Sequence, residues 1–147
     1  MARHKPDNRR ELADLQIKLK NTDRELGQLN WDLARELITL AGETKDPGPL
    51  IQAVEALSSA TRYYSFEDAP REHALIQKAI ADTLLTLGQS TGDRDTLTTA
   101  RDAYRGAITL ASLLSDDELR ESLRISYKAT LDLIGHRSKT PSLFRVA

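Results

Sequence analysis

The stretch Leu85–Asp93, LTLGQSTGD, decides the fold because related segments occur before and after it at a constant spacing. ITLAGETKD begins at Ile38 and DLIGHRSKT begins at Asp132, so each copy starts 47 residues after the one before. The small residue of each copy falls in register at Ala41, Gly88 and Gly135. Self-similarity at such a period is the signature of a repeat protein.

The glycines and hydroxyl residues of this stretch could also suggest a phosphate-binding loop. Such a loop needs a Lys followed by Ser or Thr after its last glycine, where the ammonium meets the anion. Here Gly92 is followed by Asp93 and Arg94, and no strand-like segment leads into the loop. A nucleotide site is therefore not expected.

Apolar columns on both sides of the small residue predict two helices in each unit. The columns of the first helix have steps of four, four and three: Leu29, Ile76 and Leu123; Leu33, Ile80 and Tyr127; Leu37, Leu84 and Leu131; Leu40, Leu87 and Ile134. The columns of the second helix follow in two copies: Leu50 and Leu97; Ala53 and Ala100; Leu57 and Tyr104; Ala60 and Ala107. These steps place each set on one side of a helix, and we expect all of these residues in the core.

One group of these residues carries a resemblance to a known family. Leu84-x-x-Leu87-Gly88 ends one helix, and Ala100, Tyr104 and Ala107 follow at fixed distances. This spacing resembles the tetratricopeptide repeat, in its long-period bacterial variety, over residues 22–136. The resemblance implies an all-α fold of antiparallel helix-turn-helix units, stacked as a short right-handed solenoid of about six helices.

The repeat register also predicts the boundaries of the chain's parts. We expect a flexible basic arm at 1–7, a single domain at 8–136 and a tail at 137–147. Within the domain we expect a degenerate helix at 8–20, repeats at 22–66 and 69–113, and a capping helix at 116–136. Thr22–Glu25 and Ser115–Glu118 are typical capping boxes, and Pro70 suits a first helical turn.

The N-terminal segment has a second interpretation. Leu12, Leu15, Leu19, Leu26, Leu29 and Leu33 follow a heptad pattern with Thr22 in a d-like place. That pattern predicts one long coiled-coil helix from about Arg9 to Ala41. The repeat register favours a break near Asn21 instead, which is the interpretation preferred here.

The tail contains apolar residues where a polar terminus would be ordinary. Pro141 is expected to stop the preceding helix, since it lacks an N–H donor. Leu143 and Phe144 are then predicted to cover the apolar face of the last helix, in the same chain or a neighbour. A disordered tail or a short linear motif is the alternative.

Composition predicts a soluble, cytoplasmic protein without a membrane-spanning segment. The chain has 147 residues and no Cys, which excludes disulfides, thiolate zinc sites and cysteine nucleophiles. Residues 1–24 contain seven Lys and Arg against four Asp and Glu, but they lack interleaved aromatics and a groove-reading motif. No nucleic-acid partner is expected.

Catalytic motifs are also lacking. His4, His73 and His136 are far apart in sequence, and neither a His-Glu-x-x-His run nor a Gly-x-Ser-x-Gly elbow occurs. We expect no enzyme activity, no metal and no cofactor.

Binding to another protein or peptide is what the tetratricopeptide resemblance implies. The inner faces of the first helices would form a groove from Trp31, Arg35, Ile38, Lys78, Asp82, Leu85, Ile125 and Asp132, with Ala129 beside them. Trp31, Ile38 and Leu85 suggest a groove that receives apolar side chains. Alternatively, Trp31 covers a helix junction, and the chain is a structural protein that self-associates through its N-terminal heptad or its uncovered last helix.

Overall fold

The computed structural model describes the backbone of residues 4–146 and the side chains of residues 8–135. Within these residues the chain forms five α-helices and no strand: α1 His4–Thr44, α2 Gly48–Ala60, α3 Pro70–Thr91, α4 Arg94–Leu113 and α5 Asp117–Val146. The predicted all-α class is confirmed. One helix fewer than six is present because the two helices expected before residue 44 are one.

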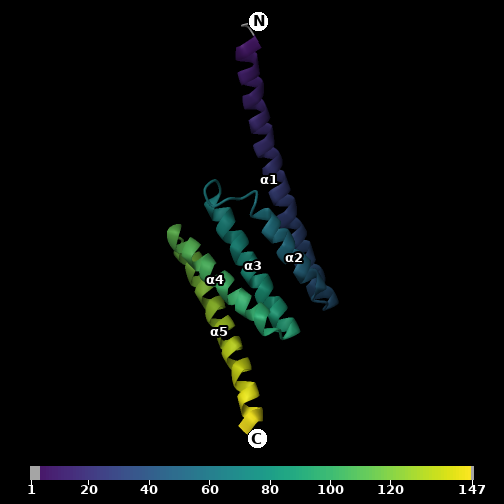
Figure 1. Cartoon of the computed structure of the whole chain (residues 1–147), viewed down its shortest axis with the longest axis vertical. Coiled ribbons are helices and arrows are strands. Elements are labelled where there is room, and N and C mark those ends of the chain that lie inside the picture. The colour runs from purple at the N-terminus through teal and green to yellow at the C-terminus, as the bar shows by residue number, and fades with distance from the viewer. Residues whose placement is uncertain (1–3, 147) are drawn as a thin grey trace.

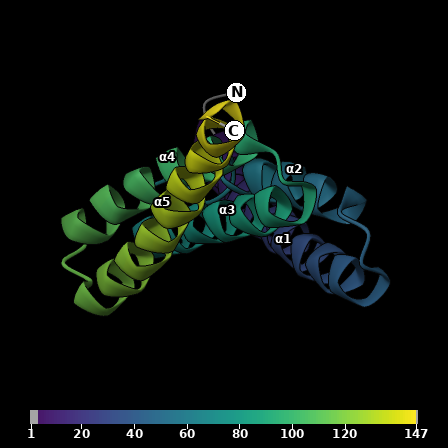
Figure 2. The same cartoon turned by 90° about the horizontal axis from the view of Figure 1, so that it is seen from below.

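Consecutive helices run in opposite directions and pack as neighbours (Figure 1). α1 packs on α2, α3 packs on α4, and α5 packs on the free side of α4, while α2 and α3 join the two parts. Seen from below, the helices form an arch with α1 and α2 on one side and α4 and α5 on the other (Figure 2). The N-terminal part of α1 and the C-terminal part of α5 project from opposite ends (Figure 1).

The core is built largely from alanines, which let the helices approach closely. All eight residues of the second-helix columns are buried: Leu50, Ala53, Leu57, Ala60, Leu97, Ala100, Tyr104 and Ala107. In the first-helix columns Ile76 and Leu123 are fully buried, because each lies under the helix pair before it. The column assignment therefore holds for these residues, but it fails at Leu131 of α5, which is 39% exposed although α3 and α4 precede it.

The two helix-helix turns repeat each other in their hydrogen bonds. Thr44 and Thr91 donate from their hydroxyls to the carbonyls four residues earlier, at 2.8 and 2.9 Å. Asp46 Oδ1 accepts from the Gly48 N–H at 3.0 Å, and Asp93 Oδ1 accepts from the Asp95 N–H at 3.3 Å. The turn chemistry thus recurs at the same 47-residue spacing as the apolar columns.

The predicted break between residues 20 and 22 is wrong, and the alternative of one long helix is confirmed, while its pairing as a coiled coil stays a prediction. α1 is continuous from His4, inside the segment expected as a flexible arm, to Thr44. Thr22 is not an N-cap: its hydroxyl donates to the Lys18 carbonyl at 2.9 Å, so it is satisfied within the helix. No proline or glycine lies between Asp7 and Leu26, and the heptad continues through the expected break. Nothing local therefore ends the helix.

The second predicted capping box needs a smaller correction. Asp116, and not Ser115, caps α5, since Asp116 Oδ1 accepts from the Leu119 N–H at 3.1 Å. Ser115 adopts a left-handed backbone with φ of 55° and belongs to the turn. α3 begins at Pro70, as expected.

The tail prediction also changes. α5 continues through Pro141 to Val146, so Pro141 does not stop the helix. A proline removes only one backbone hydrogen bond and its clash is local, so a helix can continue across it at a cost of about 3 kcal/mol. The backbone of 137–146 extends α5 and does not fold back over it. The side chains of Leu143 and Phe144 lie outside the described residues.

Candidate interaction surfaces

The groove residue with the largest side chain, Trp31, packs at the junction of α1 with the α2–α3 connection. Its ring meets the Tyr64 ring edge-on, with centroids 6.0 Å apart and planes at 74°. The Arg35 guanidinium carbon also lies over the Trp31 ring, 5.2 Å from its centroid. Trp31 is half-buried against the core between α1, α2 and α3. Most of its surface is therefore used within the chain.

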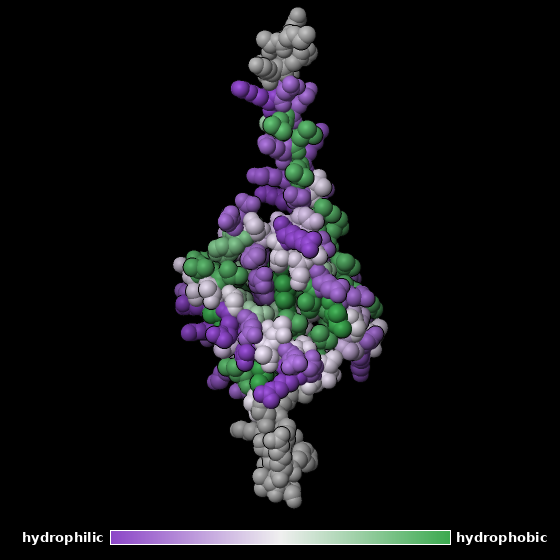
Figure 3. Space-filling view, in the orientation of Figure 1, coloured by the Kyte–Doolittle hydropathy of each residue, from purple (hydrophilic) through white to green (hydrophobic). Residues whose placement is uncertain are grey.

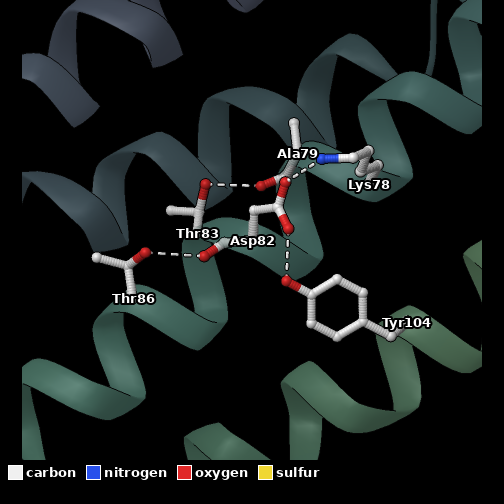
Figure 4. A network of polar contacts seen from close by, with 6 residues as sticks. All are labelled: Lys78, Ala79, Asp82, Thr83, Thr86 and Tyr104. Carbon is white, nitrogen blue, oxygen red and sulfur yellow. Dashed lines mark hydrogen bonds and ion pairs between the residues drawn. The ribbon is translucent and has the colours of Figure 1, made fainter. Parts of the chain in front are cut away.

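Two groove residues of the second repeat, Lys78 and Asp82, belong to a partly exposed polar network between α3 and α4 (Figure 4). Lys78 Nζ lies 2.7 Å from Asp82 Oδ2, and the buried Tyr104 donates to Asp82 Oδ1 at 2.5 Å. Thr83 and Thr86 each donate to a carbonyl one turn back, at 2.7 and 3.0 Å. Asp82 thus connects α3 to α4.

Burial raises the pKa of the Tyr104 hydroxyl well above its usual range, and the Asp82 carboxylate raises it further. The tyrosine remains a neutral donor, which keeps its hydrogen bond to the carboxylate. Sequence reasoning placed Asp82 in a groove and Tyr104 in the core, and it missed that the two meet. No periodicity encodes that contact.

The remaining groove residues are spread over the arch. Leu85 packs against the core between α3, α4 and α5, whereas Ile125 and Asp132 are exposed on α5. Ile38 lines a hollow of about 400 Å³ between the ends of α1, α2 and α3. Its other lining residues are Ala41, Gly42, Lys45, Asp46, Pro47, Leu50, Thr86 and Ser90.

A second hollow, of about 640 Å³, lies where α1 leaves the body. Its lining residues include the three aromatic side chains Trp31, Tyr63 and Tyr64 and six charged side chains. The charged residues are Lys20, Asp23, Arg24, Arg62, Asp68 and Glu72. Trp31 and Ile38 therefore line separate hollows, and neither hollow includes the groove residues of α5.

An exposed apolar stripe runs along α1, and it is here called the leucine seam. It consists of Leu12, Leu15, Leu19, Leu26, Leu29, Leu33 and Leu40. Their exposed fractions lie between 39 and 64%. Green surface follows the projecting part of α1 and continues down the edge of the body (Figure 3).

The seam contains three leucines that the repeat register assigned to the core. Leu29, Leu33 and Leu40 are exposed because the segment expected to pack on them, residues 8–20, is the continuation of their own helix. Within the described chain α1 packs on α2, with no helix on its other side. Because no helix of the described chain covers this side of α1, the leucine seam is an exposed surface.

The opposite side of α1 explains why the seam faces outward. Gly27, Ala34 and Ala41 are buried there, about 130° around the helix from the seam. A Cβ on Gly27 would lie 2.7 Å from Tyr64 Cε2. α1 is thereby fixed by its small residues, and its leucines point away from the body.

Three negative observations apply to the described residues. No cluster of three or more His, Asp or Glu side chains there could hold a metal ion. Every buried side-chain nitrogen or oxygen among them has a hydrogen-bond partner. No helix in that part of the chain combines the length and apolarity needed to cross a membrane.

Comparison with known proteins gives no assignment: no family model matches the chain, and neither the curated proteins nor the solved structures include a significant match. The functional argument therefore rests on the geometry of this chain.

Proposed function

We propose that this chain is a non-enzymatic protein-interaction module whose main binding surface is the leucine seam of α1. The observation that supports it is the exposure of seven leucines on one helix face. Single exposed apolar residues need no explanation, but a contiguous apolar stripe is typical of a protein interface.

The leucine seam would gain free energy if a partner buried it. Burying a leucine side chain completely is worth about 1.5–3 kcal/mol, so a half-exposed one has about 1 kcal/mol left to gain. Seven such residues amount to roughly 7 kcal/mol before the cost of association, which is several kcal/mol. A partner that covers the whole seam can therefore bind it; one that covers a few leucines cannot.

The projecting part of α1 supports the same proposal. Every side chain from Asn8 to Thr22 is exposed, so this stretch packs on nothing within the described chain. Helices of about 12–15 residues without tertiary contacts are marginal in water. A partner on the seam would supply the contacts that this stretch lacks.

The test is proximity crosslinking in the native host with a tagged chain. Leu19→Glu with Leu26→Glu places two charges in the seam, while Ile17→Glu places one on the same helix away from it. Ile17 is a matched control because it is 58% exposed and lies on the opposite side of α1. We expect the double variant to lose crosslinked proteins, including other copies of this chain, and Ile17→Glu to keep them.

Identical crosslinked proteins for wild type and the double variant would refute the seam as an interaction surface. Helicity of the variants, measured by circular dichroism, separates lost binding from lost folding. The substitutions are on the surface, so the body is expected to remain folded in all of them.

A second candidate is a peptide groove on the inner side of a tetratricopeptide-like solenoid. The specific observation in its favour is the hollow beside Ile38, whose exposed lining is mainly apolar. In this proposal Ile38 receives an apolar side chain of a partner, while Arg35 and Asp132 set its orientation. Lys78, Asp82 and Leu85 would act as supports, since their contacts are within the chain.

Ile38→Asp tests the groove in the same crosslinking experiment. Ile51→Asp is the control, because Ile51 is 53% exposed on α2 and lines neither hollow. Loss of a crosslinked protein with Ile38→Asp alone would support the groove. Equal lists for both variants and wild type would count against it.

A further inference from the structure

The spacing of the seam identifies the kind of partner that fits it. Five leucines of the seam are seven residues apart and occupy heptad position a: Leu12, Leu19, Leu26, Leu33 and Leu40. Position d holds Leu15, Thr22 and Leu29. A strict seven-residue repeat drifts around a straight helix, and it faces a partner continuously only when two helices supercoil.

We propose that the partner of the leucine seam is a second copy of this chain, and that the two α1 helices form a parallel, in-register coiled coil from Leu12 to Leu33. This inference rests on the proposed function, because it names the partner of that same surface. In this arrangement every a leucine lies against its own counterpart. Glu36 occupies the next d position and ends the coiled coil, so Leu40, the last leucine of the seam, lies outside it.

Charge complementarity beside the seam favours the parallel orientation. In a parallel pair a g residue faces the e residue five positions later in the other helix. Lys18 at g then faces Asp23 at e, twice by symmetry. Among the ion pairs of the described residues, none involves Lys18 or Asp23, so both are available.

The other flanking positions bring no like charges together in the parallel pair. Glu11 faces Gln16, and Glu25 faces Asn30. The next g residue, Asp32, faces a leucine. The parallel orientation therefore gains two opposite-charge pairs without an electrostatic penalty.

Antiparallel pairing is less favourable in both of its central registers. With Leu26 against Thr22 of the other copy, Glu25 faces Glu25 and Asp23 faces Asp23, which offsets the two attractions between Lys18 and Asp32. Leu12 then lies opposite Glu36 and loses its apolar partner. With Leu19 against Thr22, Leu33 lies opposite Asn8 and loses its apolar partner. Like charges at the centre, or an unmatched leucine, oppose these registers.

The body leaves room for a second copy. α2 packs on the side of α1 that carries the buried small residues, so the seam lies at the outer edge of the molecule (Figure 1). A parallel pair places the two bodies at the same end, each on the outside of its own α1. The complete assembly would be a two-helix stalk that carries two arches.

The first experiment measures mass and affinity by sedimentation equilibrium of the purified full chain. We expect a species of twice the mass of the 147-residue chain. Leu19→Glu with Leu26→Glu should be monomeric, and Ile17→Glu should remain dimeric. Lys18→Asp should raise the dissociation constant about tenfold, since it changes two flanking attractions into repulsions. Adding Asp23→Lys to Lys18→Asp should restore the dissociation constant of the wild-type dimer, because the two opposite-charge pairs form again with their charges exchanged.

The second experiment determines orientation, and it uses the absence of cysteine from the chain. Leu12→Cys and, separately, Leu33→Cys should each form a disulfide-linked dimer on mild oxidation, because each a residue lies beside its own copy. Ile17→Cys, on the outer face, should not. If Leu12→Cys, Leu33→Cys and Leu29→Cys each fail to crosslink alone but a mixture of Leu12→Cys and Leu29→Cys does crosslink, the pair is antiparallel and the proposed orientation is wrong.

The two proposals fail in different ways. A wild-type chain that is monomeric at 100 µM overturns the second-copy inference. If the seam variant still loses crosslinked proteins in the host, the interaction function stands and its partner is another protein. If neither self-association nor crosslinking responds to the seam, both proposals are refuted.

Discussion

Gly88 lies directly under Leu97, so closely that a side chain at Gly88 has no room. A Cβ built on Gly88 would be 2.6 Å from Leu97 Cδ2 and 3.2 Å from the Leu97 backbone nitrogen. The contact joins the end of α3 to the start of α4, where the repeat register predicts a small residue. The same columns bring Ala41 together with Leu50 in one cluster of the first repeat.

Gly88→Leu is therefore expected to destabilise the fold. Leu97 Cδ2 can move, but the Leu97 backbone cannot without opening the α3–α4 turn, and overpacking typically costs about 1–3 kcal/mol. Gly106→Ala is the matched control, since a Cβ there meets nothing within 4 Å and α4 should gain up to about 1 kcal/mol in helix propensity. Urea unfolding followed by circular dichroism measures both. Equal stability of Gly88→Leu and wild type would contradict the close packing of α3 on α4.

The sequence predicted the fold best where burial depends on repeated local contacts. The second-helix columns from Leu50 to Ala107 are all buried because every such helix lies between two others. The first-helix columns fail at Leu29, Leu33 and Leu40, because burial there needs a preceding helix that the continuous α1 does not provide. They fail also at Leu131 of α5, which is 39% exposed. A column shows which face is apolar, but not whether a neighbour covers it.

The candidate surfaces were predicted less well for a related reason. The heptad of α1 predicts one long helix, whereas the repeat register favours a break near Thr22. The hydrogen bond from Thr22 to Lys18 shows that the residue is compatible with a helix interior. The Asp82–Tyr104 contact joins residues on two helices and has no sequence signature. The first case was therefore decided by a hydrogen bond within one helix, and the second by a contact between two helices.

Tyr104→Phe should lower stability while it preserves packing. It removes the hydrogen bond to Asp82 but keeps the ring, and hydrogen bonds to charged groups are worth about 1.5–3 kcal/mol. Lys78 still pairs with Asp82, so we expect a loss near the lower end, about 1.5 kcal/mol. Thermal and urea unfolding at pH 7 provide the measurement. An unchanged free energy of unfolding would show that solvent replaces the bond at no cost.

Alkaline pH should act on the same contact. The pKa of Tyr104 is raised in the folded chain, mainly by burial, so the unfolded chain releases this proton first, near pH 10. The stabilising contribution of Tyr104 is present below that pH and is lost as the pH rises above it. Wild type should lose stability more steeply than Tyr104→Phe between about pH 10 and 11.5. Parallel curves for the two proteins would argue against a buried hydroxyl.

Asp116 should make stability sensitive to acid. The Leu119 N–H, and then the Arg71 guanidinium at 2.8 Å, hold the pKa of its carboxyl below the ordinary value. The unfolded chain therefore binds the proton first, and this stability is present above about pH 4 and lost as the pH falls below it. Asp116→Asn keeps a side chain that can cap α5 but removes the charge. The free energy of unfolding of this variant should fall less than that of wild type between pH 5 and about 3. Urea unfolding measures both proteins. An equal fall would show that Asp116 is not the source of the acid sensitivity.

Lys45→Gly should stabilise the first repeat by making its turn like that of the second. Lys45 and Gly92 are 47 residues apart, and both have a left-handed backbone, with φ of 58° and 73°. This conformation costs a non-glycine residue about 1 kcal/mol, and glycine avoids that cost. Because residue 45 lies after the end of α1, the substitution loses no helix propensity, although glycine makes the unfolded chain more flexible. We expect a net gain of about 0.5–1 kcal/mol in the free energy of unfolding.

Gly92→Ala, the reverse change in the equivalent turn, should lose about 1 kcal/mol. Urea unfolding of the two variants beside wild type measures both effects. Destabilisation by Lys45→Gly would show that the two turns differ in energy despite their shared hydrogen bonds.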